Sequence, residues 1–145
     1  MLPEALRAQI VREAQATLPR ECCGLIEGRR AADCVVVSAL RPARNLSGAA
    51  DRFEMDPADH FRALRAARLR GSEIVGCYHS HPVGRAEPSL RDRDGAAEDG
   101  FVWLIAAPQA AGGTTLAAFV FDGADFLPLD MDAPGSLDPP AASIV

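Results

Sequence analysis

Residues 73–92 read EIVGCYHSHPVGRAEPSLRD, which places two histidines, His79 and His81, two positions apart and Asp92 eleven residues further on. The apolar run before His79 predicts a central strand. Side chains two apart on a strand point to the same face, so the two imidazoles should be presented together. Pro82 lacks a backbone N–H and keeps the preceding residue extended, so the strand should end there.

A helix is expected to start at Ser89 and to run to about Asp99, which puts Asp92 in its first turn. The loop at 83–88 is long enough to fold that turn back beside the strand end. Two imidazoles and one carboxylate are a ligand set typical of a catalytic Zn²⁺ with water as the fourth ligand. The sequence therefore predicts one zinc ion per chain, held by His79, His81 and Asp92.

Asp92 has a second interpretation. Ser89-x-x-Asp92 also has the pattern of a capping box, in which Ser89 accepts a hydrogen bond from the backbone N–H of Asp92. Ligation of a metal should aim the carboxylate of Asp92 away from the cap. We favour ligation because the two histidines precede it at the required spacing.

A zinc ion lowers the pKa of its bound water and polarises a carbonyl group, so hydrolysis of a peptide or amide is the expected reaction. Such a reaction needs a group that takes the proton of the water and delivers it to the leaving amine. Glu21 is the best candidate, because it directly precedes the probable core strand that starts at Cys22-Cys23-Gly24. Position alone leaves four alternatives: Glu27, Glu54, Glu73 and Glu87.

The composition fits one compact domain and excludes several other classes. The chain has 145 residues, 48% hydrophobic residues and a net charge of −5, so nucleic acid is a poor partner. No secretory signal or apolar run of membrane-spanning length is apparent, which favours the cytoplasm and argues against a membrane protein. Four cysteines are then expected to be reduced thiols, mostly in the core: Cys22, Cys23, Cys34 and Cys77.

The rest of the chain predicts helices and strands in alternation. A helix is expected at 3–18, a hairpin from strands at 24–27 and 33–40 with its turn at 28–30, and a short strand at 52–55. Asp56-Pro57 is a strong helix start and Gly71 a stop, so a second helix should run to about residue 70. Further strands are expected at 102–106, 115–121 and 125–129.

This order predicts one α/β domain over residues 1–130, with a mixed central β-sheet flanked by helices, and a Pro-rich, flexible tail at 131–145. Three finer expectations concern side chains. Val35–Val37 should be buried on both faces of the sheet, and His60 should be solvated. The faces of the second helix should be defined by Phe61, Leu64, and Ala67 or Arg68.

The motifs resemble one known family, the JAMM (MPN+) zinc metalloproteases, especially their short bacterial and archaeal members. The resemblance covers residues 5–122 and rests on three motifs: Glu21-Cys22-Cys23-Gly24-Leu25, Asp56-Pro57 and His79-x-His81-Pro82-x6-Ser89-x2-Asp92. It implies a single MPN/JAMM domain with a cytidine-deaminase-like fold. It further implies that Glu21 is the general base and that Ser89 stabilises the oxyanion.

Members of that family cleave the bond after the C-terminal Gly-Gly of ubiquitin or ubiquitin-like proteins, and short bacterial relatives act on sulfur-carrier proteins. The resemblance implies the same class of substrate for this chain. Two alternatives remain open: a zinc hydrolase of small peptides, and a non-catalytic MPN-type scaffold. The scaffold is disfavoured because scaffold members generally lose metal ligands, whereas this chain keeps His79, His81 and Asp92.

Overall fold

The computed structural model describes residues 2–31 and 34–132, and its centre is one six-stranded sheet. The strand order is β2-β1-β3-β4-β5-β6, and β3 with β4 is the one parallel pair among them. The strands are β1 (Cys23–Ala31), β2 (Cys34–Ala43), β3 (Glu73–Ser80), β4 (Phe101–Pro108), β5 (Thr114–Phe121) and β6 (Phe126–Leu129), and the helices are α1 (Glu4–Thr17), α2 (Pro57–Leu69) and α3 (Leu90–Gly95). The expected α/β domain with a mixed sheet is confirmed.

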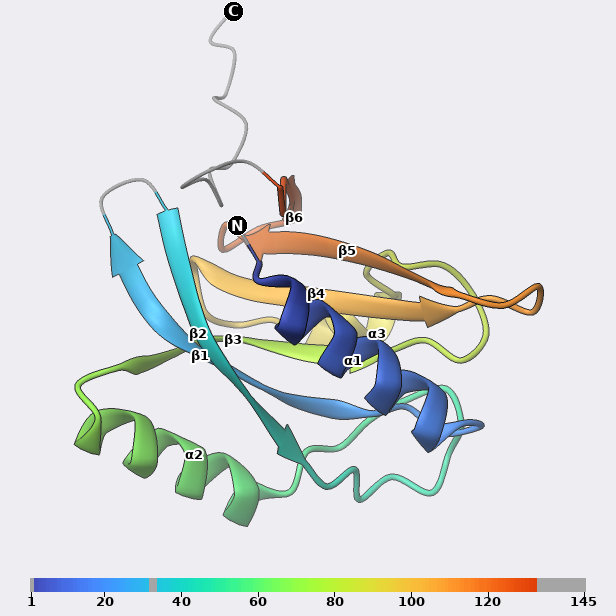
Figure 1. The fold of residues 1–145 in the computed structure, drawn as a ribbon, viewed down its shortest axis with the longest axis horizontal. Coiled ribbons are helices and arrows are strands. Elements are labelled where there is room, and N and C mark those ends of the chain that lie inside the picture. Colours follow the sequence, from blue (N-terminus) through green and yellow to red (C-terminus); the bar gives the residue numbers. More distant parts are fainter. Residues whose placement is uncertain (1, 32–33, 133–145) are drawn as a thin grey trace, which may run out of the picture.

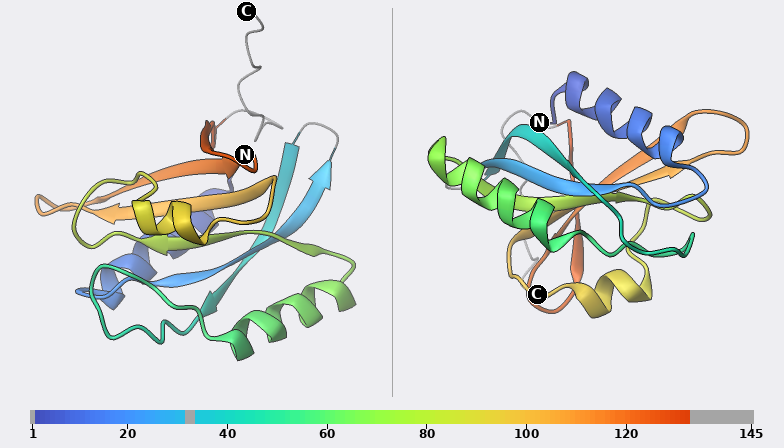
Figure 2. Two further views of the ribbon diagram at one scale, coloured as in Figure 1. Left: turned by 180° about the vertical axis from the view of Figure 1, so that it is seen from behind. Right: turned by 90° about the horizontal axis from the view of Figure 1, so that it is seen from below.

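The helices form two outer layers. Helix α1 covers one face of the sheet, and α2 and α3 lie on the other (Figures 1 and 2). Ile10 and Ala14 of α1 pack with Tyr78 of β3 in one core, whereas Ala63 of α2 packs with Cys77 in a second core. From Cys77 onward, alternation along β3 separates the two cores, so Cys77 and His79 lie on the face of α2 and α3. Ile74 and Val75 have the opposite parity, because the register with β1 shifts between Ile26 and Glu27.

Two glycines let β3 sit close to its neighbours. A Cβ atom at Gly76 would lie 2.2 Å from the carbonyl oxygen of Val102 on β4, and one at Gly24 of β1 would lie 2.4 Å from the ring of Tyr78. Tyr78 is fully buried and donates a 2.6 Å hydrogen bond to Glu13 of α1. Gly24 and Gly76 therefore allow β3, the strand that carries His79, to pack closely against both β1 and β4.

Helix α2 begins and ends as its sequence predicts. Asp56 accepts a 2.7 Å hydrogen bond from the backbone N–H of Ala58, and Gly71 follows the helix with φ of 68°. The expected faces were wrong for Phe61 and Leu64, which are exposed, whereas Ala67 is buried as expected and packs together with Ala63. Small side chains allow a close approach of this helix to the sheet, which a pattern based on large apolar residues misses.

Four predicted boundaries or environments differ from the structure. Residues 28–30 belong to β1, and the register with β2 shifts between Glu27 and Gly28, so the glycine serves a bulge and not a turn. The expected strand at 52–55 is reduced to an isolated bridge between Asn45 and Met55. Val36 is 56% exposed because β2 is an edge strand. Helix α3 ends at Gly95, and residues 96–99 lead irregularly into β4.

The start of the expected tail contacts the N-terminal segment. The backbone N–H of Leu2 donates to the carbonyl of Met131 at 3.0 Å, and Arg7 donates to the same oxygen at 2.8 Å. The remainder of the tail, residues 133–145, lies outside the described residues, so its flexibility stays a prediction. Within residues 2–31 and 34–132, no helix is long and apolar enough to cross a membrane.

A buried carboxylate joins three elements at the end of the sheet opposite the histidines. Glu27 of β1 is 2% exposed and accepts hydrogen bonds from Arg41 of β2 at 2.6 Å, from Arg70 at 2.7 and 2.9 Å, and from Ser72 at 2.5 Å. The hydrogen bonds from Arg70 lower the pKa of Glu27 to about 2, against the effect of burial and with help from Ser72 and Arg41. The ionised form of Glu27 therefore stabilises the fold.

We expect Glu27→Gln to lower the free energy of unfolding by roughly 2–4 kcal/mol at neutral pH, because it leaves two guanidinium groups without their carboxylate. A depressed pKa contributes stability above the ordinary value of 4.5, and this contribution is lost as the pH falls through about 2. Urea unfolding at several pH values should show the difference from wild type shrinking below pH 4.5. Glu87→Gln, at an exposed site, is the control, and a difference independent of pH would contradict the assignment.

Candidate active site

The two histidines and Asp92 meet where β3 ends. His79 is fully buried, and its Nε2 lies 3.0 Å from Nε2 of His81. Oδ1 of Asp92 is 3.1 Å from Nε2 of His79, and Oδ2 is 3.3 Å from Nε2 of His81. One ligand atom from each residue therefore lies within 4.8 Å of the other two, as a metal site requires. The structure brings together the three residues that the sequence pointed to.

The rings of both histidines are held by their surroundings. Nδ1 of His81 lies 2.8 Å from the carbonyl oxygen of Arg85, and its N–H can donate there while Nε2 keeps its lone pair for the centre. The ring of His79 lies between Phe53 and Trp103, with ring centroids 4.8 and 5.9 Å away. This environment lowers the pKa of His79 by burial, which favours the neutral imidazole that binds metals.

Asp92 serves the helix cap and faces the histidines at the same time. Its Oδ2 accepts hydrogen bonds from the backbone N–H and the hydroxyl of Ser89, both at 2.7 Å, and Ser89 in turn accepts from the N–H of Asp92. The capping box is therefore present, and the expectation that the carboxylate turns away from the cap is wrong. Two oxygens with several lone pairs allow both contacts.

The charge of Asp92 is set by these contacts. Burial acts to raise the pKa of Asp92, but hydrogen bonds with the two histidines and with Ser89 outweigh burial and hold the pKa well below its usual range. The same contact with Asp92 outweighs burial at His81 and raises the pKa of that imidazole. An anionic carboxylate thus faces two imidazole nitrogens in a largely buried site.

The pairing of β1 with β3 carries Glu21 to the site. Cys23 lies opposite His79 in the register, the N–H of Ser80 donates to the carbonyl of Cys22 at 3.1 Å, and the N–H of Cys22 donates to the hydroxyl of Ser80 at 2.8 Å. Glu21 directly precedes Cys22, so the same register continued beyond the start of β1 would place Glu21 opposite His81. Glu21 is 4% exposed and lines a cavity together with Ser89 and Asp92.

Burial raises the pKa of Glu21 to about 7, with the charge of His81 opposing and the charge of Asp92 adding to the rise. A carboxyl group with a pKa near neutrality can both take and return a proton at physiological pH. Of the four alternatives, Glu27 is paired with Arg41 and Arg70. The other three glutamates are exposed: Glu54, Glu73 and Glu87. Among the described residues, Glu21 is the glutamate that lines the cavity at Asp92.

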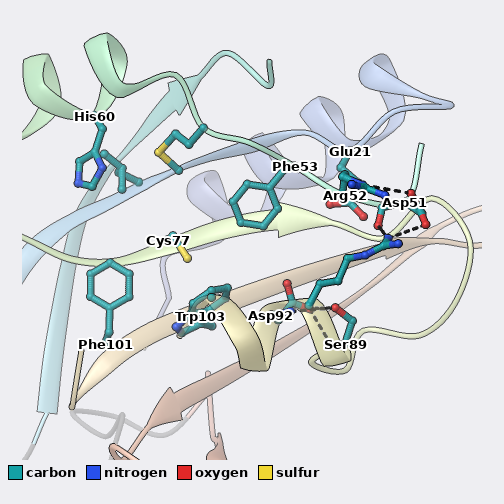
Figure 3. Close-up of a pocket in the computed structure, with 14 residues that line it drawn as sticks. Glu21, Asp51, Arg52, Phe53, His60, Cys77, Ser89, Asp92, Phe101 and Trp103 are labelled. Carbon is teal, nitrogen blue, oxygen red and sulfur yellow. Dashed lines mark hydrogen bonds and ion pairs between the residues drawn. The ribbon is translucent and has the colours of Figure 1, made fainter. Parts of the chain in front are cut away.

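That cavity has a volume of about 400 Å³ and extends away from Asp92 between α3 and the loop before α2 (Figure 3). Its inner wall is aromatic and aliphatic, and the residues that form it are Leu25, Phe53, Met55, Phe101 and Trp103. Its mouth is charged, and Arg91 donates there to the carboxylate of Asp51 at 2.5 Å. His60 is exposed, as its sequence context suggested, and it also lines the cavity.

A second, smaller cavity of about 260 Å³ meets the same centre from another side. It shares Glu21, Asp51 and Ser89 with the first cavity, and its other lining residues are Ala50, His81, Pro82 and Val83. Two cavities therefore meet at Glu21 and Ser89, an arrangement that suits a reaction in which one bond joins two parts of a substrate.

Sequence reasoning missed Asn45, which shapes the loop over the site. Its Nδ2 donates to the carbonyl of Glu21 at 3.0 Å and to that of Arg52 at 3.3 Å, while Oδ1 accepts from the N–H groups of Ser47 and Glu54. The side chain of Asn45 thus connects the loop at 45–54 to Glu21 through hydrogen bonds. The only signal in the sequence is an asparagine in a loop, which is too common to single it out.

Comparison with known proteins identifies the family. Residues 3–120 match the family described as prokaryotic homologs of the JAB domain, and the chain belongs to this family. A desampylase of Haloferax volcanii is 36% identical over 92 residues, which cover 63% of this chain and 65% of the relative. A probable TtuB-protein conjugate cleaving protease of Thermus thermophilus is 37% identical over 92 residues, 63% of this chain and 56% of the relative.

The deubiquitinase MYSM1 of Mus musculus is 43% identical over 76 residues, which are 51% of this chain and 9% of that protein. The chain thus spans just under two thirds of the length of the desampylase and a small part of the deubiquitinase. Among solved structures, protein DSY2949 from Desulfitobacterium hafniense superposes with a TM-score of 0.74 at 29% identity, over 85% of this chain and 86% of that one. The fold and the motif thus point to the same family.

We expect Ser80→Ala to lower the free energy of unfolding by about 1–3 kcal/mol, because it leaves the buried N–H of Cys22 without an acceptor. Urea unfolding followed by circular dichroism would measure the change. Ser38→Ala, on the exposed part of β2, should cost less than about 0.5 kcal/mol. Equal losses in the two variants would contradict the role of Ser80 as the anchor of the segment that carries Glu21.

Proposed function

We propose that this chain is a zinc-dependent peptidase or isopeptidase that cleaves the bond after the C-terminal Gly-Gly of a ubiquitin-like protein. In this proposal, His79, His81 and Asp92 bind one Zn²⁺, and Glu21 is the general base. The convergence of three ligand atoms within 4.8 Å beside a buried glutamate carries the proposal.

The three residues fit zinc in chemistry as well as in spacing. Two neutral imidazole nitrogens and one carboxylate oxygen suit this borderline cation, and they leave a position for water and the substrate carbonyl. The contact from Nδ1 of His81 to the carbonyl of Arg85 is the outer contact that orients such a ligand. Zinc, when bound, supplies polarisation of the scissile carbonyl and a lowered pKa for the attacking water.

The remaining steps belong to the side chains of the chain. The carboxylate of Glu21 takes the proton of the attacking water and then passes it to the nitrogen of the leaving amine. The hydroxyl of Ser89 donates to Asp92 at 2.7 Å and can turn to donate to the developing oxyanion, while the backbone N–H of Ser89 keeps its own 2.7 Å contact with Asp92. Asp92 therefore retains a partner throughout.

The proposed substrate class rests on the similar proteins. The similarity to desampylases, to a probable TtuB-protein conjugate cleaving protease and to a deubiquitinase supports a ubiquitin-like protein as the substrate. We propose a sulfur-carrier-type protein with a Gly-Gly tail as the partner here, in the cytoplasm. Cleavage of small peptides is the main alternative. A scaffold role is disfavoured, because it does not require His79, His81 and Asp92 to converge in a buried position.

The test of function uses ubiquitin-like sulfur-carrier fusions that extend past Gly-Gly. Purified zinc-loaded protein should release the extension, and Glu21→Gln should lower kcat/KM by about 10²- to 10⁴-fold because the proton transfer is lost. Glu54→Gln, at an exposed glutamate, should cleave like wild type. No cleavage by wild type, or undiminished cleavage by Glu21→Gln, would refute the proposal, and faster hydrolysis of free dipeptides than of folded fusions would favour the alternative.

Metal content gives a separate test of the ligands. We expect wild type and Glu21→Gln to retain about one zinc per chain in elemental analysis, and His81→Ala to retain far less, because two ligands rarely hold zinc. His60→Ala removes the remaining histidine without touching the centre and should keep its zinc. Zinc loss in both histidine variants, or in neither, would be incompatible with the assigned site.

A further inference from the structure

The cavity beside Asp92 is a continuation of the proposed centre. Glu21, Ser89 and Asp92 form one end of it, and its wall continues through Trp103 to Phe101. The ring centroids of His79 and Trp103 are 5.9 Å apart, and those of Trp103 and Phe101 are 6.5 Å apart. A substrate chain bound at the proposed metal site could therefore continue along the aromatic wall that Trp103 and Phe101 form.

Chain length decides which residue of a substrate reaches that wall. An extended chain spans at most about 3.3–3.6 Å per residue, so two glycines cover roughly 7 Å. With the last glycine carbonyl at the three ligand atoms, the two glycines would occupy the end of the cavity that Glu21, Ser89 and Asp92 form. The third residue back from the scissile bond would then reach the part of the cavity that Trp103, Phe101 and Met55 line.

The residues that form this wall favour an apolar side chain of a substrate. At the mouth, Asp51 pairs with Arg91 at 2.5 Å and with Arg52 at 3.8 Å, and the inner wall offers no charged partner. Two ring nitrogens are buried without a hydrogen-bond partner among the described residues: Nδ1 of His79 and the donor Nε1 of Trp103, a residue that is 6% exposed and lines the cavity. Such a donor is costly unless a ligand supplies an acceptor, and a backbone carbonyl of an extended tail is one.

We propose that this cavity is a specificity subsite for a large apolar side chain, such as leucine or phenylalanine, at the third position before the scissile bond. The chain would then prefer carrier tails of the form apolar-Gly-Gly over tails with a small or charged residue at that position. The inference rests on the proposed function and deepens it. The leaving group takes the second cavity, beside Pro82 and Val83 on the other side of Glu21.

A binding measurement tests the subsite without catalysis. Trp103 is the sole tryptophan of the chain, so its fluorescence reports directly on the wall of the cavity. Glu21→Gln protein loaded with zinc is titrated with synthetic heptapeptide amides that contain Leu-Gly-Gly, Ala-Gly-Gly or Asp-Gly-Gly before the scissile bond and no aromatic residue. We expect a saturable change in Trp103 emission with the Leu peptide, and binding weaker by about 10- to 100-fold with the Ala and Asp peptides. Identical titration curves for the three peptides would overturn the subsite.

Cleavage kinetics on folded carrier fusions with the same three tails add an independent measurement. Wild type should show a loss in kcat/KM of about 10- to 100-fold from Leu to Ala. Met55→Ala, which enlarges the cavity, should reduce this preference, whereas Leu69→Ala on the exposed face of α2 should keep it. Urea unfolding of both variants verifies that they fold.

The outcomes separate the two proposals. No cleavage of any fusion refutes the proposed function, while the fluorescence titration still decides the subsite. Cleavage that is indifferent to the third residue refutes the subsite alone. Cleavage that depends on the size of the residue after the scissile bond, in a manner altered by Met55→Ala, would assign the cavity to the leaving group and also refute the subsite.

Discussion

The site depends on the way β3 is paired on both of its edges. Antiparallel pairing with β1 sets Cys23 opposite His79, and parallel pairing with β4 continues to His81, whose N–H donates to the carbonyl of Ala106 at 2.7 Å. A shift by one residue in either ladder would turn the side chain of His79 to the opposite face. Gly24 and Gly76 remove the Cβ atoms that would prevent this close pairing. The positions of Glu21 and both histidines thus follow from one register.

Two buried glutamates on β1 and just before it show how the same strand serves stability and chemistry. Glu27 meets two guanidinium groups and a hydroxyl, and its pKa falls to about 2. Glu21, six residues earlier, has no arginine hydrogen bond among the described contacts, and burial raises its pKa to about 7. A carboxylate that is fully paired holds the fold but cannot exchange protons near neutrality. The glutamate that we propose as the general base is thus the one without an arginine hydrogen bond.

The sequence predicted those parts of the structure that depend on local patterns. The strand before His79, the cap at Asp56 and the first turn at Ser89 follow from spacing and chain geometry within about ten residues. Asn45 and Phe53 could not be found, because their importance comes from contacts with Glu21 and His79 that only the folded chain creates. Phe61 and Leu64 of α2 were misplaced for a related reason: the small side chains of Ala63 and Ala67 let this helix approach the sheet closely, so alanines form its buried face.

Helix α3 shows why the site and the cavity are coupled. With six residues it is too short to be stable alone, so its position comes from outside contacts. Arg93 pairs with Asp125 and lies 5.7 Å above the ring of Phe126, while Arg91 donates to the backbone and side chain of Asp51. The loop with Asp51 also carries Phe53, which packs on His79. In the proposed subsite, a substrate side chain would contact both Phe53 of this loop and the end of α3 at Gly95, so binding of the tail would be coupled to the position of Asp92.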